Sequence, residues 1–290
     1  VNYLDYDVFA HAYGPRHRRA FRALRRIDRS IHQLWRVLRR VPEHGYDLYV
    51  LSDHGQAACT PYLDLSGGRP VEQALFEDFF DPLSVHEAPE PSGRMAHGIA
   101  AYRTHRAPGL FQRFVNYLEQ DFALVLGGVR HVRERNGIRV VSAGPNAFVY
   151  FLETQAPVGI EWIEQRFPGL GEELSRSRGI GFVLARSAAG PLCFWRGKRY
   201  RLDELHAGPF AGRRDLPSVV EGFRDLMAMA SAGDLIIYGT DAPEGHVSFV
   251  PEVGAHAGTS PEELHTFLIH PQAVELLAPI GHPVELYPLF

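Results

Sequence analysis

The sequence has few cysteines. Cys59 and Cys193 are the only two among its 290 residues, and neither belongs to a Cys-x-x-Cys pair. A disulfide framework and a cysteine-based metal site are therefore both excluded. Two buried thiols are the favoured interpretation, and a single bridge between them is the alternative.

Long apolar runs are also missing. The most apolar stretch, residues 122–129, contains Gly127 and Gly128 and falls well short of the roughly 18 residues that a membrane span needs. No signal peptide is visible. Because the chain begins with Val1 in what resembles the middle of a domain, we expect an N-terminal part, with any targeting segment, to precede it.

The sequence also has no excess of basic residues. The formal net charge is -4, which argues against a protein whose main task is to bind a nucleic-acid backbone. Hydrophobic residues make up 45% and charged residues 22%, a balance typical of a globular protein with a sizeable core. The sequence shows no internal repeat and no low-complexity tract.

Residues 16–40 give the clearest helix signal. Apolar side chains recur there at three- and four-residue spacing, which predicts one apolar stripe, and arginines crowd the other face, which we interpret as solvated. Pro42 and Gly45 end the pattern. The stripe consists of Phe21, Leu24, Ile27, Ile31, Leu34 and Leu38.

Two short apolar runs predict buried strands. Residues 46–52 follow the helix, so we expect a parallel strand in a β-α-β order, and residues 234–238 predict a second buried strand. Residues 1–7 are interpreted as the end of a strand that enters a loop.

The remaining segments form a loop-rich insertion followed by short elements. Proline and glycine punctuate residues 60–110, where only residues 71–80 are predicted to be helical. Further helices are predicted at residues 110–126, 159–167, 216–230 and 261–265. Further strands are predicted at residues 138–142, 147–152, 181–185, 247–250 and 266–269, with a hairpin over 192–202 that turns at Gly197.

Asp7 and His11 form the first candidate pair of metal ligands. They stand four positions apart, a spacing that places both side chains on one face of a helical turn, where they can hold one cation.

Asp53 and His54 form a second pair, directly after the predicted strand at residues 46–52. Ligands bind at the carboxyl ends of strands in open α/β sheets, and Gly55 lets the backbone turn there. His256 lies between Gly254 and Gly258 in a late loop. Aspartate oxygen and histidine nitrogen are typical zinc ligands and also suit manganese. Two such ions about 4 Å apart can bind the attacking and leaving oxygens of a phosphoryl displacement.

Taken together, the motifs resemble the type I phosphodiesterase and nucleotide pyrophosphatase family of the alkaline phosphatase superfamily. The resemblance rests on Asp-Val-Phe-Ala-His-Ala-Tyr-Gly-Pro at 7–15, Ser-Asp-His-Gly at 52–55 and Gly-Ala-His-Ala-Gly at 254–258. It extends to residues 146–152 and 233–238, where the family places strands.

The resemblance implies a metal-dependent hydrolase of small phosphate esters with two divalent ions, zinc first and manganese as the alternative. Asp7, His11 and His256 would bind one ion, and Asp53 and His54 the other. The reaction would proceed in two displacements that begin from a serine or threonine hydroxyl.

Several positions depart from the family pattern. The nucleophile, and one further aspartate ligand, are expected upstream of the first motif, where only six residues precede Asp7, so no catalytic nucleophile is assigned within this chain. Ala10 and Ala257 stand where the family usually has glycine, and we expect both small residues to be tolerated.

The expected fold is α/β, an alkaline-phosphatase-like sandwich with a mainly parallel central sheet between helices and a smaller α+β cap. Residues 1–60 and 231–290 would form the metal-binding core, incomplete at its N-terminus. Residues 61–139 would form the insertion and residues 140–230 the cap.

Other residues compete for the same roles. Asp5 could replace Asp7, and His246 could be the third ligand in place of His256. Asp241 is expected beside the site as a supporting residue. We interpret the remaining candidate histidines as ordinary packing or surface residues, with contact to a substrate phosphate as the alternative for those in the insertion; they are His86, His97, His105, His131, His265 and His270.

Three function classes stay open at this point. The first is the phosphodiesterase or phosphatase described above. The second is a sulfatase, phosphonate hydrolase or phosphomutase on the same scaffold, and the third is a catalytically inactive binding relative. The resemblance favours a place in the cell envelope or outside the cytoplasm, and no binding to a nucleic-acid scaffold is expected.

Overall fold

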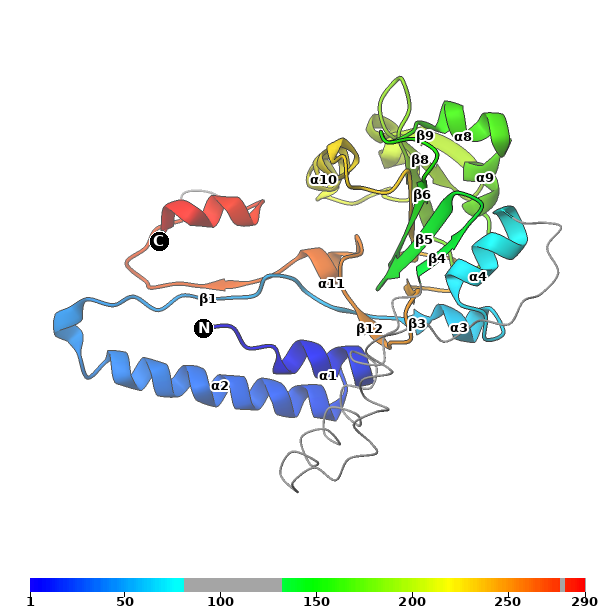
Figure 1. Ribbon diagram of the computed structural model, residues 1–290. Helices are drawn as coiled ribbons and strands as arrows, with labels where there is room; N and C mark the ends of the chain where they lie inside the picture. The colour runs from blue at the N-terminus through cyan, green and yellow to red at the C-terminus, as the bar shows by residue number, and fades with distance from the viewer. Residues whose placement is uncertain (81–131, 277–279, 290) are drawn as a thin grey trace.

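A seven-stranded antiparallel sheet is the largest element of the computed structural model, which describes residues 1–80, 132–276 and 280–289. The strands follow the order β4-β5-β6-β10-β7-β8-β9 (Figure 1). They are β4 (Val132–Arg135), β5 (Ile138–Ala143), β6 (Asn146–Phe151), β7 (Phe182–Ala185), β8 (Leu192–Trp195), β9 (Lys198–Arg201) and β10 (Leu235–Tyr238).

The alternation of side chains along β10 explains why helices cover both faces of this sheet. Leu235 and Ile237 face one core, and Ile236 and Tyr238 face another, because successive side chains of a strand point to opposite sides. The first core is covered by α4 (Val71–Leu75), α8 (Ile160–Arg166) and α9 (Leu170–Leu174), and the second by α10 (Leu216–Ala228) with a 3-10 helix at Leu202–Ala207.

The antiparallel pairing corrects the expected parallel central sheet. The strand predicted at residues 234–238 is present as β10, but it pairs antiparallel with both β6 and β7. It therefore belongs to the same sheet as the predicted cap, although the expected boundary at residue 231 would assign it to the core. The described chain is a mixed α/β structure, as expected, with the opposite strand direction in its main sheet.

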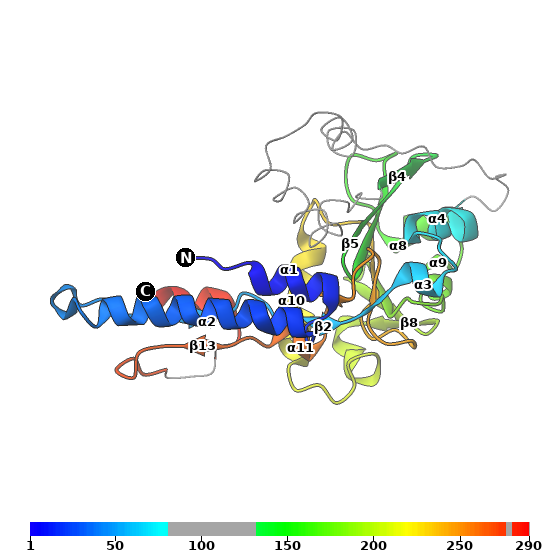
Figure 2. The same cartoon turned by 90° about the horizontal axis from the view of Figure 1, so that it is seen from below.

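A second part of the molecule extends away from this sheet, as Figures 1 and 2 both show. We call it the arm (residues 1–51, 266–276 and 280–289), and we call the sheet with its helices the body (residues 60–80 and 132–250). The elements of the arm are α1 (Asp5–Tyr13), α2 (Arg18–Leu38), β1 (Val50–Leu51), β13 (Leu268–Ile269) and two 3-10 helices at Pro42–His44 and Pro283–Leu289.

The arm has little core of its own. Helix α2 matches its predicted extent, but its buried residues are Ala20 and Ala23, which pack with Phe9 and Ala10 of α1. The predicted apolar stripe is largely exposed, with Phe21 at 49% and Leu24 at 45% exposure. None of the six stripe residues is buried by the described part of the chain.

Two sequence expectations at the start of the chain are wrong. Residues 1–7 do not end a strand: residues 1–4 have no regular structure, and helix α1 begins at Asp5. The strand predicted at residues 46–52 is reduced to β1, which pairs antiparallel with β13 and is only partly buried. It is therefore neither parallel nor part of a buried sheet.

One small sheet lies in the segments that join arm and body, and a second lies in the adjoining part of the body. Strand β12 (Gly254–Ala255) pairs antiparallel with β2 (Ala57–Ala58), and β11 (Val247–Ser248) pairs parallel with β3 (Thr60–Pro61). Two short helices complete the described elements here, α3 (Tyr62–Leu65) and α11 (Pro261–Leu264). These sheets position the loops that carry the candidate ligands.

Most of the other predicted elements are confirmed. The helix predicted at residues 71–80 is present as α4 followed by a π-helical turn at Phe76–Phe80, and the predicted hairpin is β8-β9 with Gly197 at φ 74°. The helix predicted at residues 110–126 lies outside the described residues, as do His86, His97, His105 and His131.

Both cysteines are free thiols, as expected, but only Cys193 is buried, whereas Cys59 is half-buried. Every helix in the described part of the chain is too short or too polar to cross a membrane.

Candidate metal centre

Helix α1 presents Asp7 and His11 on one face, as their spacing predicts. His11 Nε2 lies 3.3 Å from Asp7 Oδ1. Because Phe9 and Ala10 pack against α2, the two polar residues are directed away from that contact and are only 30% and 15% exposed. The helix ends at Gly14, whose φ of 94° favours glycine.

His54 follows β1 in a turn that only glycine permits. A Cβ on Gly55 would lie 2.0 Å from the carbonyl oxygen of Glu262, so close approach to α11, rather than a positive φ, requires glycine here. His54 Nδ1 lies 2.9 Å from the carbonyl oxygen of Gly55, and a donated hydrogen bond there leaves the Nε2 lone pair available to a ligand.

His256 belongs to the loop that follows β12. A Cβ on Gly254 would lie 2.3 Å from the carbonyl oxygen of Ala10, so this strand touches α1 directly. Ala257 adopts a φ of 75°, a left-handed conformation in which an alanine costs about 1 kcal/mol. Asn146 Nδ2 donates a hydrogen bond to the carbonyl oxygen of Ala257 over 2.8 Å, which connects the loop to β6.

Asp7, His54 and His256 converge on one point from three segments of the chain. One ligand atom from each can be chosen so that all lie within 4.8 Å of one another. The His54 and His256 rings stack with their centroids 3.7 Å apart, and the His11 ring lies edge-on to His256 at 5.0 Å. Four of the predicted ligands are thus brought together by α1 and the loops after β1 and β12.

The protonation states of Asp7 and His256 suit a cation, whereas His11 must release a proton to bind one. Burial raises the pKa of Asp7, but the contact with His11 and the nearby histidines outweigh burial and lower the pKa below its ordinary value. Burial lowers the pKa of His11, but Asp7 and Glu252 outweigh it and raise the pKa to about 10. Burial and the neighbouring His54 lower the pKa of His256, which keeps its imidazole neutral.

One carboxylate oxygen in the group is buried without a hydrogen bond from the described part of the chain. Asp7 Oδ1 is buried and accepts no hydrogen bond from the described residues, although His11 Nε2 and His256 Nε2 lie 3.3 and 3.7 Å away. A buried, ionised oxygen without a partner is costly. One carboxylate oxygen among imidazole nitrogens is a donor set that a zinc-type cation satisfies, so the residues present fit a divalent metal.

Asp53 is adjacent to the group but open to solvent. Its side chain is 81% exposed, and its Oδ1 accepts a hydrogen bond from the His54 amide over 3.1 Å. Its Oδ1 lies 3.8 Å from His54 Nε2, so a second ion there would have Asp53 and His54 as its ligands among the described residues.

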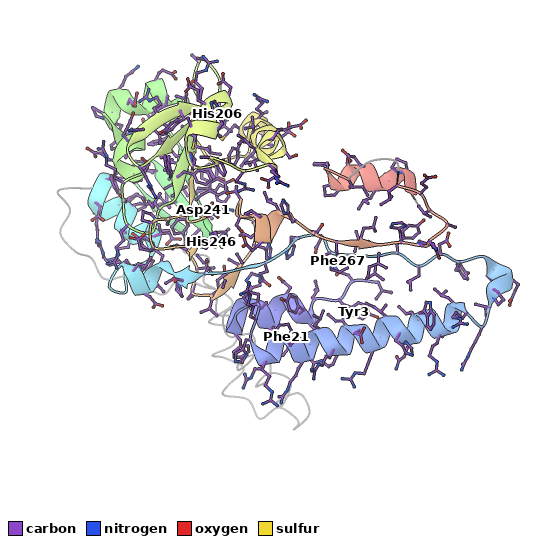
Figure 3. All side chains as sticks on the ribbon, turned by 180° about the vertical axis from the view of Figure 1, so that it is seen from behind. Tyr3, Phe21, His206, Asp241, His246 and Phe267 are labelled. Carbon is purple, nitrogen blue, oxygen red and sulfur yellow. The ribbon has the colours of Figure 1, made fainter. Side chains whose placement is uncertain are left out.

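The rival ligands lie elsewhere. Asp5 pairs with Arg26 at 3.5 Å, and His246 lies 3.7 Å from Asp241, the residue expected to support the site. Figure 3 shows Asp241 and His246 in the body, apart from Tyr3, Phe21 and Phe267 in the arm. His265 contacts Asp215 at 3.2 Å.

The contact of Glu252 with the candidate site was not predicted from the sequence. Its Oε2 lies 2.7 Å from His11 Nδ1, although 241 positions separate the two residues. A glutamate four positions before His256 was the available signal, but nothing in the spacing connects it to the first motif.

An aspartate and three histidines that converge in this way define a candidate divalent-metal site. Residues 1–90 match the family model of the type I phosphodiesterase / nucleotide pyrophosphatase, so the family resemblance is confirmed over that segment. The matched range includes Asp7, His11, Asp53 and His54, so the likeness to this phosphoester-hydrolase family rests on the segment that carries these four residues. No curated protein and no solved structure matches the chain.

Proposed function

We propose that the protein hydrolyses small phosphate esters, of the phosphodiesterase, nucleotide pyrophosphatase or phosphatase type, with two divalent metal ions. Zinc is the first choice of metal and manganese the alternative. The main support is the convergence of Asp7, His54 and His256 within 4.8 Å, in a chain whose first 90 residues match the phosphodiesterase family model. An alkaline-phosphatase-like core is part of this proposal.

Five side chains would hold the ions. The resemblance assigns Asp7, His11 and His256 to one ion and Asp53 and His54 to the other, whereas the geometry also allows His54 to join Asp7 and His256. Bound divalent ions supply charge neutralisation at phosphate oxygens and lower the pKa of a hydroxyl or water.

The chain's own residues prepare the site for that chemistry. Asp7 remains ionised because its pKa is lowered, and His256 remains neutral because its pKa is lowered too, so both are in the protonation state that binds a cation. Asp53, exposed at the edge of the group, is open to an incoming ester. The proposed nucleophile is a serine or threonine hydroxyl that is not among the metal-binding residues named above.

Elemental analysis of the full-length protein, followed by turnover of bis-p-nitrophenyl phosphate and p-nitrophenyl phosphate, tests the proposal. We expect about two zinc ions per chain and hydrolysis of at least one ester. Asp7→Asn and His256→Ala should each reduce metal content and turnover, whereas His246→Ala should change neither, because His246 contacts Asp241 instead.

Each contrary result points to a different function. Bound metal without turnover of either ester would overturn phosphate-ester hydrolysis in favour of sulfate or phosphonate chemistry, phosphoryl mutase activity, or an inactive relative. A protein without metal, indifferent to His256→Ala, would contradict the metal site itself.

A further inference from the structure

Glu252 is a buried carboxylate that touches the candidate site without belonging to its ligands. It is 8% exposed, and both of its oxygens are engaged. Oε2 lies 2.7 Å from His11 Nδ1, and Oε1 accepts a hydrogen bond from Ser248 Oγ over 2.6 Å. Glu252 is not among the residues whose ligand atoms converge, and its contact with the site is through His11.

The position of this carboxylate is set by the backbone around it. Val253 N donates to the carbonyl oxygen of His11 over 3.0 Å, and Cys59 N donates to the carbonyl oxygen of Val253 over 3.1 Å. Glu252 is therefore held beside the last turn of α1 and beside β2 at the same time. A carboxylate fixed in this way can impose an orientation on the imidazole that it contacts.

Ser248 fixes the other end of the carboxylate. It is fully buried in β11, and its Oγ also accepts a hydrogen bond from Val250 N over 3.3 Å. On the far side of this segment, Phe249 N donates to the carbonyl oxygen of Gly144 over 2.7 Å. The chain of contacts thus runs from the β5-β6 turn of the body, through Ser248 and Glu252, to His11 in the arm.

We propose that Glu252, held by Ser248, is a positioning residue that fixes the His11 ring with Nδ1 as the donor to Glu252 and Nε2 directed at Asp7. An ionised carboxylate can only accept, so the proton between the two groups belongs to Nδ1. The Nε2 atom, 3.3 Å from Asp7 Oδ1, is then the atom available to a cation. This inference rests on the proposed metal site.

The decisive comparison uses two substitutions of Glu252 and one matched control. Glu252→Gln keeps the shape but loses the charge, and Glu252→Ala loses both. Asp234→Asn is the control, because Asp234 is also a buried carboxylate that accepts two hydrogen bonds, from Phe151 N and Val158 N, and it is 5% exposed.

We expect zinc affinity, measured by competition with a chromogenic chelator, to fall about 10- to 100-fold in Glu252→Gln and further in Glu252→Ala. Ser248→Ala should cause a smaller loss in the same direction. Asp234→Asn should leave zinc affinity unchanged, even if it lowers the unfolding free energy. Circular dichroism should confirm that each variant compared is folded.

A spectroscopic readout separates positioning from a purely structural role. The Nδ1 proton of His11 in the zinc-bound wild type should give a downfield proton resonance, which should move upfield in Glu252→Gln because an amide is a weaker acceptor than a carboxylate. Wild-type zinc affinity and an unmoved resonance in Glu252→Gln would overturn the inference. A wild-type protein that binds neither zinc nor manganese would instead overturn the proposed function.

Discussion

At the scale of single residues, the carboxylate of Asp215 makes a bidentate ion pair with Arg213. Arg213 binds it through two nitrogens, with Nη2 at 2.6 Å from Oδ2 and Nε at 2.9 Å from Oδ1. Arg213 also donates to the carbonyl oxygen of Thr259, in the loop that carries His256. The pair therefore stabilises the connection between α10 and the candidate site.

Replacing this carboxylate should give a pH-dependent loss of stability. The hydrogen bond from Arg213 lowers the pKa of Asp215 to about 2, from an ordinary value of 3.8. The folded-state pKa is depressed, so the stabilisation is present above 3.8 and is lost as the pH falls through 2. We expect Asp215→Asn to lower the unfolding free energy by about 2 kcal/mol near neutral pH, and by clearly less at about pH 3.

Urea unfolding of the variant and the wild type at both pH values measures this difference. Asp203→Asn is the control, because the Arg201–Asp203 pair is 60% and 65% exposed and exposed pairs contribute little. An Asp215→Asn effect that stays the same at both pH values would contradict the charge-based origin.

The sequence predicted the relative positions of side chains correctly where the residues lie close together in the chain. Asp7 and His11 share one helical face, as their spacing implies, and His54 and His256 join them from distant loops that the family pattern identified. Glu252 could not be predicted, because its role depends on a contact with His11 that only the folded chain creates.

At the scale of elements, the close packing of β12 on α1 determines where His256 lies. Gly254 is the contact point, since a Cβ there would lie 2.3 Å from the carbonyl oxygen of Ala10. That oxygen belongs to the helix backbone, which cannot move aside as a flexible side chain would. Any side chain at position 254 must therefore separate the strand from the helix.

We expect Gly254→Ala to weaken zinc binding by about tenfold or more, because it separates His256 from Asp7 and removes a correctly placed ligand. Zinc affinity is the measurement, and Gly222→Ala is the control, since a Cβ on Gly222 would meet nothing within 4 Å. Wild-type affinity in Gly254→Ala would show that this contact does not set the position of His256.

Elements with a regular pattern and a core to pack against were predictable. The alternation in β5 and β6 and the apolar stripe of α10 match burial in the body. Residues 46–52 are also rich in strand-forming residues, but only Val50 and Leu51 pair with another strand among the described residues. Strand direction was missed, because the insertion of β10 between β6 and β7 is a long-range pairing that local sequence does not encode.

At the scale of the whole molecule, arm and body differ strongly in burial. All four residues of β10 are buried, whereas α2 buries only Ala20 and Ala23 over 21 residues. The amides of β10 should therefore exchange with solvent most slowly, and those of the arm should exchange at a lower opening free energy. Hydrogen exchange followed by mass spectrometry measures both.

Bound zinc should reduce the difference in hydrogen exchange between arm and body, and it should do so in particular segments. The proposed ligands come from α1 in the arm and from the loops after β1 and β12, so a bound ion links the arm to the segments that join it to the body. A ligand that binds only the native arrangement stabilises it by mass action, and the segments that open to release the ion gain the protection. We expect zinc to slow exchange in residues 5–13, 53–56 and 254–258, and to leave α8 and α9 unchanged.

The same experiment on Asp7→Asn should show no zinc-dependent change in these three segments. Equal protection throughout the chain, or protection that persists in Asp7→Asn, would mean that zinc binds elsewhere, because only an ion held by Asp7, His54 and His256 contacts all three segments at once.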